Sequence, residues 1–189
     1  MNKEQELEYN AIEDKGFKGR RANDFVDPFK FLAGTRMGSN CKMVSMKAKF
    51  IGEAITSSPE GPNRRWFKSV VFSSFLEHGL NIIYNDLVHK YGLKVLHITG
   101  ETPGPDREER MTIFNNGEAD VMLISKAGGE GLDMKGVRKM FLYEPSWNDA
   151  TKEQAEGRVN RYRSHAHLPL EERNVTVYTL TSVRDPLLP

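Results

Sequence analysis

The stretch DVMLISKAGGEGLD (120–133) joins a short apolar run directly to a loop with three glycines in four positions. Its first part, DVMLI (120–124), has the length and the β-branched side chains of a fully buried strand. The loop that follows offers close backbone approach to a ligand and free N–H groups for an anion. Because ligands of parallel sheets bind at the carboxyl ends of the strands, this loop is a candidate binding site.

Four more apolar runs of strand length lie on either side of this stretch, and helical patterns alternate with them. The runs are KSVVF (68–72), KVLHI (94–98), RKMFLY (138–143) and NVTVYTL (174–180). The expected helices are one with the apolar stripe Leu76, Leu80, Ile83, Leu87 and Tyr91 that closes at Gly92, one that begins at Pro105, and one from about Asp149 to Ser164. This alternation predicts an α/β fold with a doubly wound, mostly parallel sheet.

The regular pattern begins near residue 65, which divides the chain into two expected parts. Residues 65–189 are predicted to form the α/β domain, and residues 1–64 a helical extension and linker. Within the extension, residues 42–57 have helical spacing, and the first 24 residues are polar, with a short helix and then a basic loop expected. The apolar residues 187–189, with no polar tail, suggest a piece of a longer protein.

The composition limits the classes of protein to consider. With 28% charged and 38% hydrophobic residues, the chain is typical of a soluble globular protein, and no apolar run approaches the roughly 18 residues of a membrane span. A net charge of +1 means that nucleic-acid binding would need a local basic patch. The single cysteine, Cys41, excludes an internal disulfide and fits an intracellular compartment.

Several ligand sites can be excluded by motif. A dinucleotide fingerprint counted from Gly129 needs glycine at 134, where Met134 stands, and no GxxxxGK[ST] loop or Asp-Glu strand end occurs. The chain alone is therefore not expected to bind ATP with its metal and hydrolyse it. His165 and His167 have no second pair of ligands at metal-binding spacing, so no metal site is expected.

The last predicted helix carries the most distinctive polar pattern. Gln154, Arg158, Arg161 and His165 are spaced i, i+4, i+7 and i+11, which places them on one helical face. Two arginines one turn apart can direct two planar guanidinium groups at one phosphate. A solvated basic face would produce the same pattern, so both interpretations stay open on this evidence alone.

Four segments in order resemble motifs of the superfamily 2 helicases. They are VVFSSF (70–75) for motif IV, ITGETPGPDREER (98–110) with Gly100 and Arg110 for the stretch after it, SKAGGEGLD (125–133) for motif V, and QAEGRVNR (154–161) for motif VI. Trp147-Asn148 and the start NKEQELEY resemble the Swi/Snf-type translocases. EPSWN (144–148) with QAEGRVNRYRSH (154–165), and FLAGTRMGSN (31–40), resemble helicase-like proteins of large DNA viruses.

The resemblance implies the C-terminal RecA-like lobe of an ATP-driven helicase or translocase. It implies that Arg158 and Arg161 are arginine fingers, that Gln154 positions them and the attacking water, and that Gly129, Gly131 and Asp133 line the nucleotide side. It implies nucleic-acid phosphate contacts from Ser73, Thr99, Gly100, Ser125 and Lys126. Ser73 as a helix cap, Asp133 as a turn cap and Trp147 as a core residue are the simpler alternatives.

The resemblance also implies what this lobe works with. ATP and Mg²⁺ would belong to a two-lobe parent, with none expected on this chain alone, and the partners would be the first RecA-like lobe and DNA, with RNA as the alternative. Glu130 and Asp133 place two acids in the motif V loop, which departs from the usual Swi/Snf pattern and would weaken phosphate binding nearby. The alternatives are a stand-alone, non-catalytic binding module and an unrelated phosphate-binding α/β protein.

Overall fold

The computed structural model describes residues 46–57, 67–145 and 149–182, with the side chains of 149–152 excepted. The features expected at residues 2–21, 31–40, 147–148 and 187–189 lie outside the described residues. The elements, in chain order, are α3 (Met46–Thr56), β1 (Ser69–Ser73), η1 (Leu76–Leu80), α4 (Asn81–His89), β2 (Val95–Ile98), α5 (Gly104–Asn115), β3 (Val121–Ser125), β4 (Lys139–Leu142), α6 (Asp149–Val159), η2 (Leu170–Glu172) and β5 (Thr176–Thr179).

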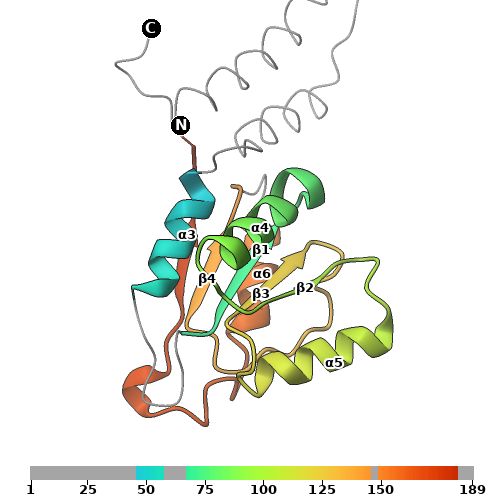
Figure 1. The fold of residues 1–189 in the computed structure, drawn as a ribbon. Helices are drawn as coiled ribbons and strands as arrows, with labels where there is room; N and C mark the ends of the chain where they lie inside the picture. The colour runs from blue at the N-terminus through green and yellow to red at the C-terminus, as the bar shows by residue number, and fades with distance from the viewer. Residues whose placement is uncertain (1–45, 58–66, 146–148, 183–189) are drawn as a thin grey trace, which may run out of the picture.

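The five strands form one parallel sheet in the order β2-β3-β1-β4-β5 (Figure 1). Three strands lie within their predicted apolar runs, and β1 and β3 extend one residue beyond theirs, so the predicted doubly wound sheet is confirmed. The central strand β1 pairs with β3 on one side and β4 on the other, and Ser69 is in register with both Val121 and Lys139. All carboxyl ends therefore meet at one edge of the sheet, where the polar loops begin.

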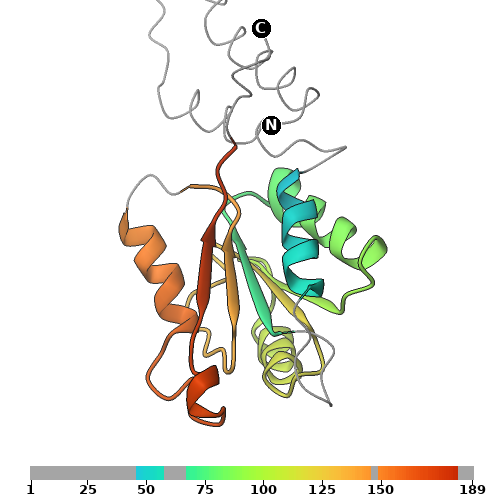
Figure 2. The same cartoon turned by 90° about the vertical axis from the view of Figure 1, so that its left-hand side faces the viewer.

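The two faces of the sheet are covered by different helices, as Figure 2 shows. Successive side chains of a strand point to opposite faces. Val70 belongs to the core cluster that includes Phe114 of α5 and Val159 of α6. Val71 belongs to the other cluster, with Ile55 of α3 and residues of α4. The helix expected within residues 42–57 is thus part of the packed domain.

The helix after β1 begins with an unpredicted π-helical turn. Leu80 donates its amide hydrogen to the Phe75 carbonyl at 3.1 Å, and His78 has non-helical backbone angles. Gly92 then ends the helical stripe with a φ of 61°, as its position predicted. Short π-helical segments are frequent near functional sites, and this one directly follows β1, whose end carries the sequence that resembles motif IV. Among the described residues, no helix is long and apolar enough to cross a membrane.

The last helix is shorter than expected, and one expectation drawn from it is wrong. α6 ends at Val159 and not at Ser164, because Ser164 donates hydrogen bonds to the Arg161 carbonyl and Arg163 adopts a left-handed φ of 63°. His165 therefore does not share a helical face with Arg158. It turns inward, and only 7% of its surface is exposed.

The core predicts a clear difference between two substitutions. Phe114 is fully buried where α5 packs on the sheet, so Phe114→Ala should lower the free energy of unfolding by about 3–5 kcal/mol. Leu170, which is 79% exposed, is the control, and Leu170→Ala should change it by less than about 0.5 kcal/mol. Urea unfolding monitored by circular dichroism measures both, and equal losses would contradict this description of the core.

Candidate functional site

The glycine-rich loop after β3 is closed by two hydrogen bonds to one serine. The Gly128 amide donates to Ser125 Oγ at 3.0 Å, and the Gly129 amide donates to the Ser125 carbonyl at 2.9 Å. A Cβ atom on Gly128 would lie 2.3 Å from the Ile98 carbonyl oxygen and 2.6 Å from Thr99 Cα. Only glycine fits there, and the loop is therefore held against the end of β2.

The next glycine lies under an arginine of α6. A Cβ atom on Gly129 would be 2.0 Å from Arg158 Nη1, so the guanidinium occupies the space that a side chain would fill. This contact joins the loop that resembles motif V to the helix that resembles motif VI. The Nη1 atom is shielded from solvent and has no hydrogen-bond partner among the described residues. Arg158 therefore holds a buried donor that no described group satisfies.

The electrostatics of Arg158 reflect this position. Burial lowers the pKa of Arg158 below its ordinary value, Glu130 acts in the opposite direction, and the positive charge of Arg161 lowers it further. Guanidinium groups nevertheless stay protonated in proteins, so the site keeps two neighbouring positive charges. Arg161 is exposed just beyond the end of α6, and Gln154 is exposed on α6 itself.

Gly131 and Asp133 lie further along the same loop. Gly131 has a φ of 73°, a conformation that favours glycine, and open space around its Cα. The Asn115 side chain donates to the Asp133 carbonyl at 3.0 Å and accepts from the Lys135 amide at 2.9 Å, which fixes this part of the backbone. In the described part of the chain, no ion pair joins Asp133 to Arg158 or Arg161, and the Asp133 side chain is exposed.

The five residues expected to contact phosphates lie at the ends of three adjacent strands, but their exposure differs. Ser73 and Ser125 are register partners in β1 and β3, Thr99 follows β2, and a Cβ atom on Gly100 would be 2.9 Å from Ala127 Cβ in the glycine-rich loop. Lys126 and Gly100 are exposed. Ser73 is fully buried, and the Ser125 hydroxyl already accepts the Gly128 amide hydrogen.

Two side chains that sequence reasoning did not single out organise these loops. Glu144, which is buried, accepts the Ser73 hydroxyl hydrogen at 2.6 Å and the Ser74 amide hydrogen at 3.1 Å. Arg107 on α5 donates to the Gly128 carbonyl, whereas Arg110, which resemblance favoured, donates to the His97 carbonyl at 2.6 Å. The sequence signals for Glu144 were its place directly after a strand and within EPSWN, and the resemblance pointed to Arg110 and not to Arg107.

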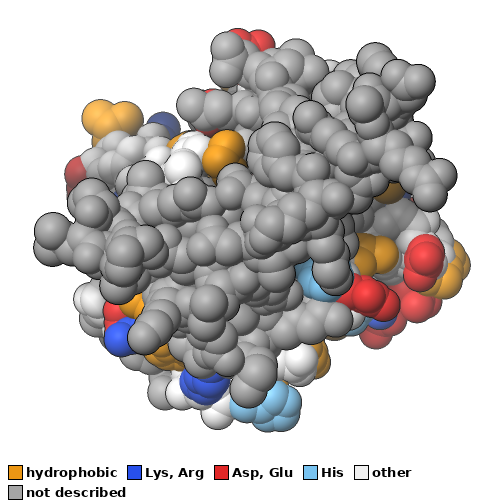
Figure 3. Space-filling model, turned by 90° about the horizontal axis from the view of Figure 1, so that it is seen from above, with side chains coloured by type: hydrophobic (Ala, Val, Ile, Leu, Met, Phe, Trp, Pro, Cys, Tyr) orange, Lys and Arg blue, Asp and Glu red, His pale blue; other side chains and the backbone are white. Residues whose placement is uncertain are grey.

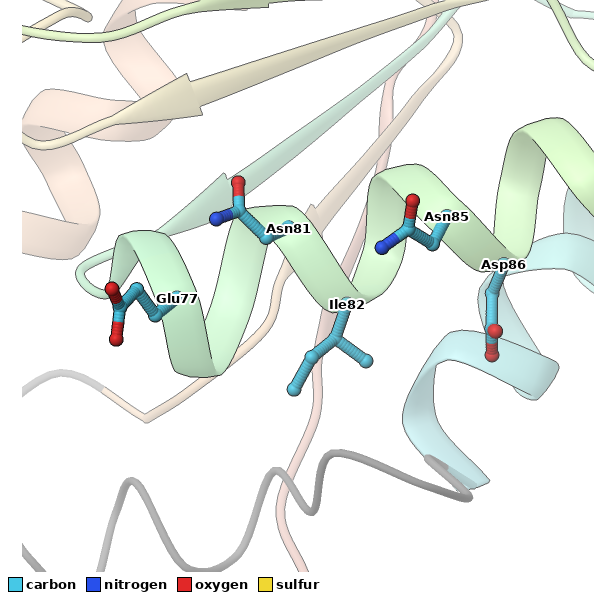
Figure 4. Close-up of a pocket in the computed structure, with 5 residues that line it drawn as sticks. All are labelled: Glu77, Asn81, Ile82, Asn85 and Asp86. Atoms are coloured by element: carbon cyan, nitrogen blue, oxygen red, sulfur yellow. The ribbon is translucent and has the colours of Figure 1, made fainter.

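Two hollows lie on the α4 side, away from Arg158. A groove of about 380 Å³ runs along η1 and α4. Figure 4 shows Glu77, Asn81 and Asn85 in a row, with Asp86 beyond them. The acidic lining of the groove does not suit a phosphate. A smaller, mostly apolar cavity of about 240 Å³ lies beside Thr99 and His97. Burial lowers the pKa of His97, and the charge of Arg110 lowers it further.

The charge distribution agrees with the small net charge. In the described part of the face shown in Figure 3, Lys and Arg side chains lie at separate places and form no continuous basic patch. The described residues also contain no group of three side chains suited to hold a metal ion. Among the described residues, Arg158 and Arg161 are two positive charges close enough to influence each other beside the glycine-rich loop.

A parallel sheet in this order, with a glycine-rich loop in contact with an arginine of the last helix, defines a RecA-like lobe. Residues 47–163 match the family described as the helicase conserved C-terminal domain, and the chain belongs to this family. The family consists of ATP-dependent helicases and translocases.

Viral proteins are among the similar sequences. A protein of Acanthamoeba polyphaga mimivirus named for ATP-dependent RNA helicase activity, L538, is 32% identical over 153 residues, which are 81% of this chain and 33% of that protein. A termination factor NPH-I homolog of African swine fever virus is 30% identical over 124 residues, 61% of this chain and 17% of the viral protein. The chain thus spans a third or less of the length of these relatives.

Solved structures show the same fold. The Sulfolobus solfataricus SWI2/SNF2 ATPase core domain superposes with a TM-score of 0.72 at 20% identity, covering 97% of this chain and 38% of that one. The C-terminal domain of the same ATPase gives a TM-score of 0.60 at 17% identity, covering 78% of this chain and 69% of that one. The predicted likeness to Swi/Snf-type second lobes is confirmed at the level of the fold.

The contact between Gly129 and Arg158 predicts different effects of alanine at two glycines. Gly129→Ala should displace the Arg158 side chain, which is flexible, with a small loss of stability. Gly131→Ala should cost about 1–2 kcal/mol because of its left-handed backbone, yet leave Arg158 in place. The Arg158 Nε–Hε resonance in nuclear magnetic resonance spectra and chemical unfolding measure the two effects. An unmoved Arg158 resonance in Gly129→Ala would contradict the observed geometry.

Proposed function

We propose that this chain is the second motor lobe of an ATP-dependent helicase or translocase, and that it supplies arginine fingers and nucleic-acid backbone contacts. The observation that carries the proposal is the Arg158 guanidinium held over Gly129 with an unpaired, shielded Nη1 atom. An unpaired buried donor is costly unless a partner arrives. The γ-phosphate of ATP bound to a first lobe is the partner that the family membership suggests.

In this proposal, Arg158 and Arg161 act on the reacting phosphate. A finger stabilises the charge that develops on the transferred phosphoryl group in the transition state. In related NTPases this contribution is about 10³–10⁵ in rate. Gln154, exposed on the same helix, would orient the arginines and the attacking water. Gly129, Gly131 and Asp133 would line the nucleotide side of the lobe.

The triphosphate and its Mg²⁺ would be held by the other lobe. The chain has no GxxxxGK[ST] loop and no strand that ends in an Asp-Glu pair, the usual means of holding phosphates and metal. ATP would supply the free energy for movement when the two lobes close on it and open after hydrolysis. The isolated chain should therefore not turn over ATP.

The nucleic-acid side would use the ends of β1, β2 and β3. Exposed Lys126 and the exposed backbone of Gly100 are suited to reach phosphates, with Thr99 and Ser125 holding the loops beside them. Ser73 would act through its bond to Glu144, since its own hydroxyl is buried. Contacts of this kind position the strand without reading sequence. We propose DNA as the polymer. RNA is the alternative to be tested, because the mimiviral relative is named for RNA helicase activity.

The finger assignment is tested in the native polypeptide of which this lobe is proposed to be a part. Arg161→Ala should lower ATP turnover at saturating nucleic acid by about 10³-fold without loss of folding, because Arg161 is exposed. Arg163→Ala is the matched control, since the Arg163 guanidinium packs over Tyr162. Turnover is measured by phosphate release, and wild-type turnover in Arg161→Ala would remove Arg161 from this role.

The nucleic-acid contact is tested with the 189-residue chain and labelled DNA and RNA of equal length. Binding should weaken as salt rises, and Lys126→Ala should reduce the slope of log affinity against log salt by about one. Lys90→Ala is the control, because Lys90 pairs with Asp86 on α4. Fluorescence anisotropy gives the slopes. An affinity that does not depend on salt would contradict the proposed backbone contacts. Tighter binding of RNA than of DNA would identify RNA as the polymer.

A further inference from the structure

Ser164 and His165 follow the second arginine, and the function proposed above gives them no role. Both are buried, at 3% and 7% exposure. Between the end of α6 and Ser164 the chain is exposed, and Tyr162 is 89% exposed. Arg163 then takes its left-handed conformation and the chain turns inward. The burial of Ser164 and His165 directly after an exposed turn indicates that these two residues fasten the turn to the interior of the domain.

Ser164 binds the backbone of Arg161 twice. Its amide donates to the Arg161 carbonyl at 3.0 Å, and its hydroxyl lies 2.8 Å from the same carbonyl oxygen. The hydroxyl is also 2.8 Å from His165 Nδ1. It has one hydrogen to donate, and three acceptors lie within reach: the Arg161 carbonyl, His165 Nδ1 and, at 3.3 Å, the Val159 carbonyl. Because Nε2 carries the hydrogen of a neutral ring, Nδ1 can only accept, so the bond to His165 forms when the hydroxyl donates to Nδ1. In every arrangement the Ser164 amide keeps Ser164 joined to Arg161.

The other end of this chain of bonds lies just before β4. His165 Nε2 is 2.6 Å from the Val137 carbonyl, and since a carbonyl only accepts, Nε2 carries the hydrogen. The Gly136 amide donates to the Ser164 carbonyl at 2.9 Å. Val137 is fully buried, and β4, which begins at Lys139, pairs with β1 on one side and β5 on the other. The exposed turn is thus tied to a rigid part of the core.

The connection between β3 and β4 therefore meets both arginines. Near its start, Gly129 lies under the Arg158 guanidinium. Near its end, Gly136 and Val137 hold Ser164 and His165, and through them the backbone of Arg161. Arg158 is placed by the regular backbone of α6, but Arg161 lies beyond the end of that helix and has no such support.

We propose that Ser164 and His165 are positioning residues for Arg161, an inference that rests on the function proposed above. They fix the backbone from which the Arg161 guanidinium extends towards the transferred phosphate. The need is geometric, because a displacement of about 1 Å at a catalytic group can cost about 10²-fold in rate. Loss of the anchor should therefore reduce turnover more than it reduces nucleotide affinity.

The anchor itself is measured first, in the 189-residue chain. His165→Ala should raise hydrogen–deuterium exchange at the Gly136 and Ser164 amides, whose hydrogen bonds belong to the anchor, and leave the amides of β1 unchanged. His165→Gln should restore protection, since its terminal amide nitrogen can donate to the Val137 carbonyl in place of Nε2. Unchanged exchange at both amides in His165→Ala would overturn the proposal.

Turnover is then measured in the native two-lobe polypeptide. Folded His165→Ala should lower kcat by about 10–100-fold with KM for ATP changed by less than about threefold, and His165→Gln should recover most of the loss. Ser164→Ala, which keeps the backbone bond to Arg161, should lower kcat by a smaller factor. His89→Ala, an exposed histidine on α4, is the control and should leave kcat unchanged.

These experiments distinguish the positioning role of Ser164 and His165 from the finger role proposed for Arg161. If Arg161→Ala abolishes turnover while folded variants of Ser164 and His165 keep wild-type kcat, the positioning role is overturned and the finger role stands. If Arg161→Ala itself keeps wild-type turnover, both fail. If His165→Ala does not fold, Ser164→Ala and His165→Gln decide: a kcat below wild type in Ser164→Ala supports the role, and wild-type kcat in both variants overturns it.

Discussion

The placement of one guanidinium over one glycine organises the site. Arg158 can lie against the loop only because Gly129 has no side chain, and the loop can approach β2 only because Gly128 has none. Gly128 thus makes room for the end of β2, and Gly129 makes room for Arg158 of α6. The Ser125 bonds hold the turn in the shape that both approaches require. A larger residue at Gly128 would push the loop away from β2, and one at Gly129 would displace the Arg158 side chain.

The sheet explains why these elements meet. β1 and β3 are buried on both faces, so their apolar side chains alternate between the α5–α6 side and the α3–α4 side. A register slip of one residue in either strand would move each of its apolar side chains to the opposite face of the sheet and disrupt both cores. With the register fixed, Ser73 and Ser125 stand together at the carboxyl edge. From there the β3–β4 connection runs past α6, which brings the loop to Arg158.

The elements were predictable from the sequence because their causes are local. A doubly covered parallel strand is a continuous apolar run, and Gly92 ends a helix through its own backbone freedom. The order of the loops and the helix around the candidate site followed from the sequence, whereas the finger role proposed for Arg158 and Arg161 comes from resemblance alone. The end of α6 was not, since the bonds that hold Ser164 and His165 come from Gly136 and Val137. The burial of Ser73 against Glu144, 71 residues away, is likewise set by tertiary packing.

In the proposed function, the acidic side chain of Glu130 in the loop has a physical role. Glu130 favours the charged form of Arg158, and it also repels an incoming phosphate. A lobe that bound phosphate tightly by itself would lower the energy of bound substrate and transition state alike, which adds nothing to kcat. Weak binding by the isolated lobe, with an arginine already placed and partly desolvated, leaves the interaction to form where charge develops. The small net charge and the acidic loop are therefore consistent with the proposed function. The arginines must be positioned accurately for the transition state, and strong attraction of phosphate to the isolated lobe is not required.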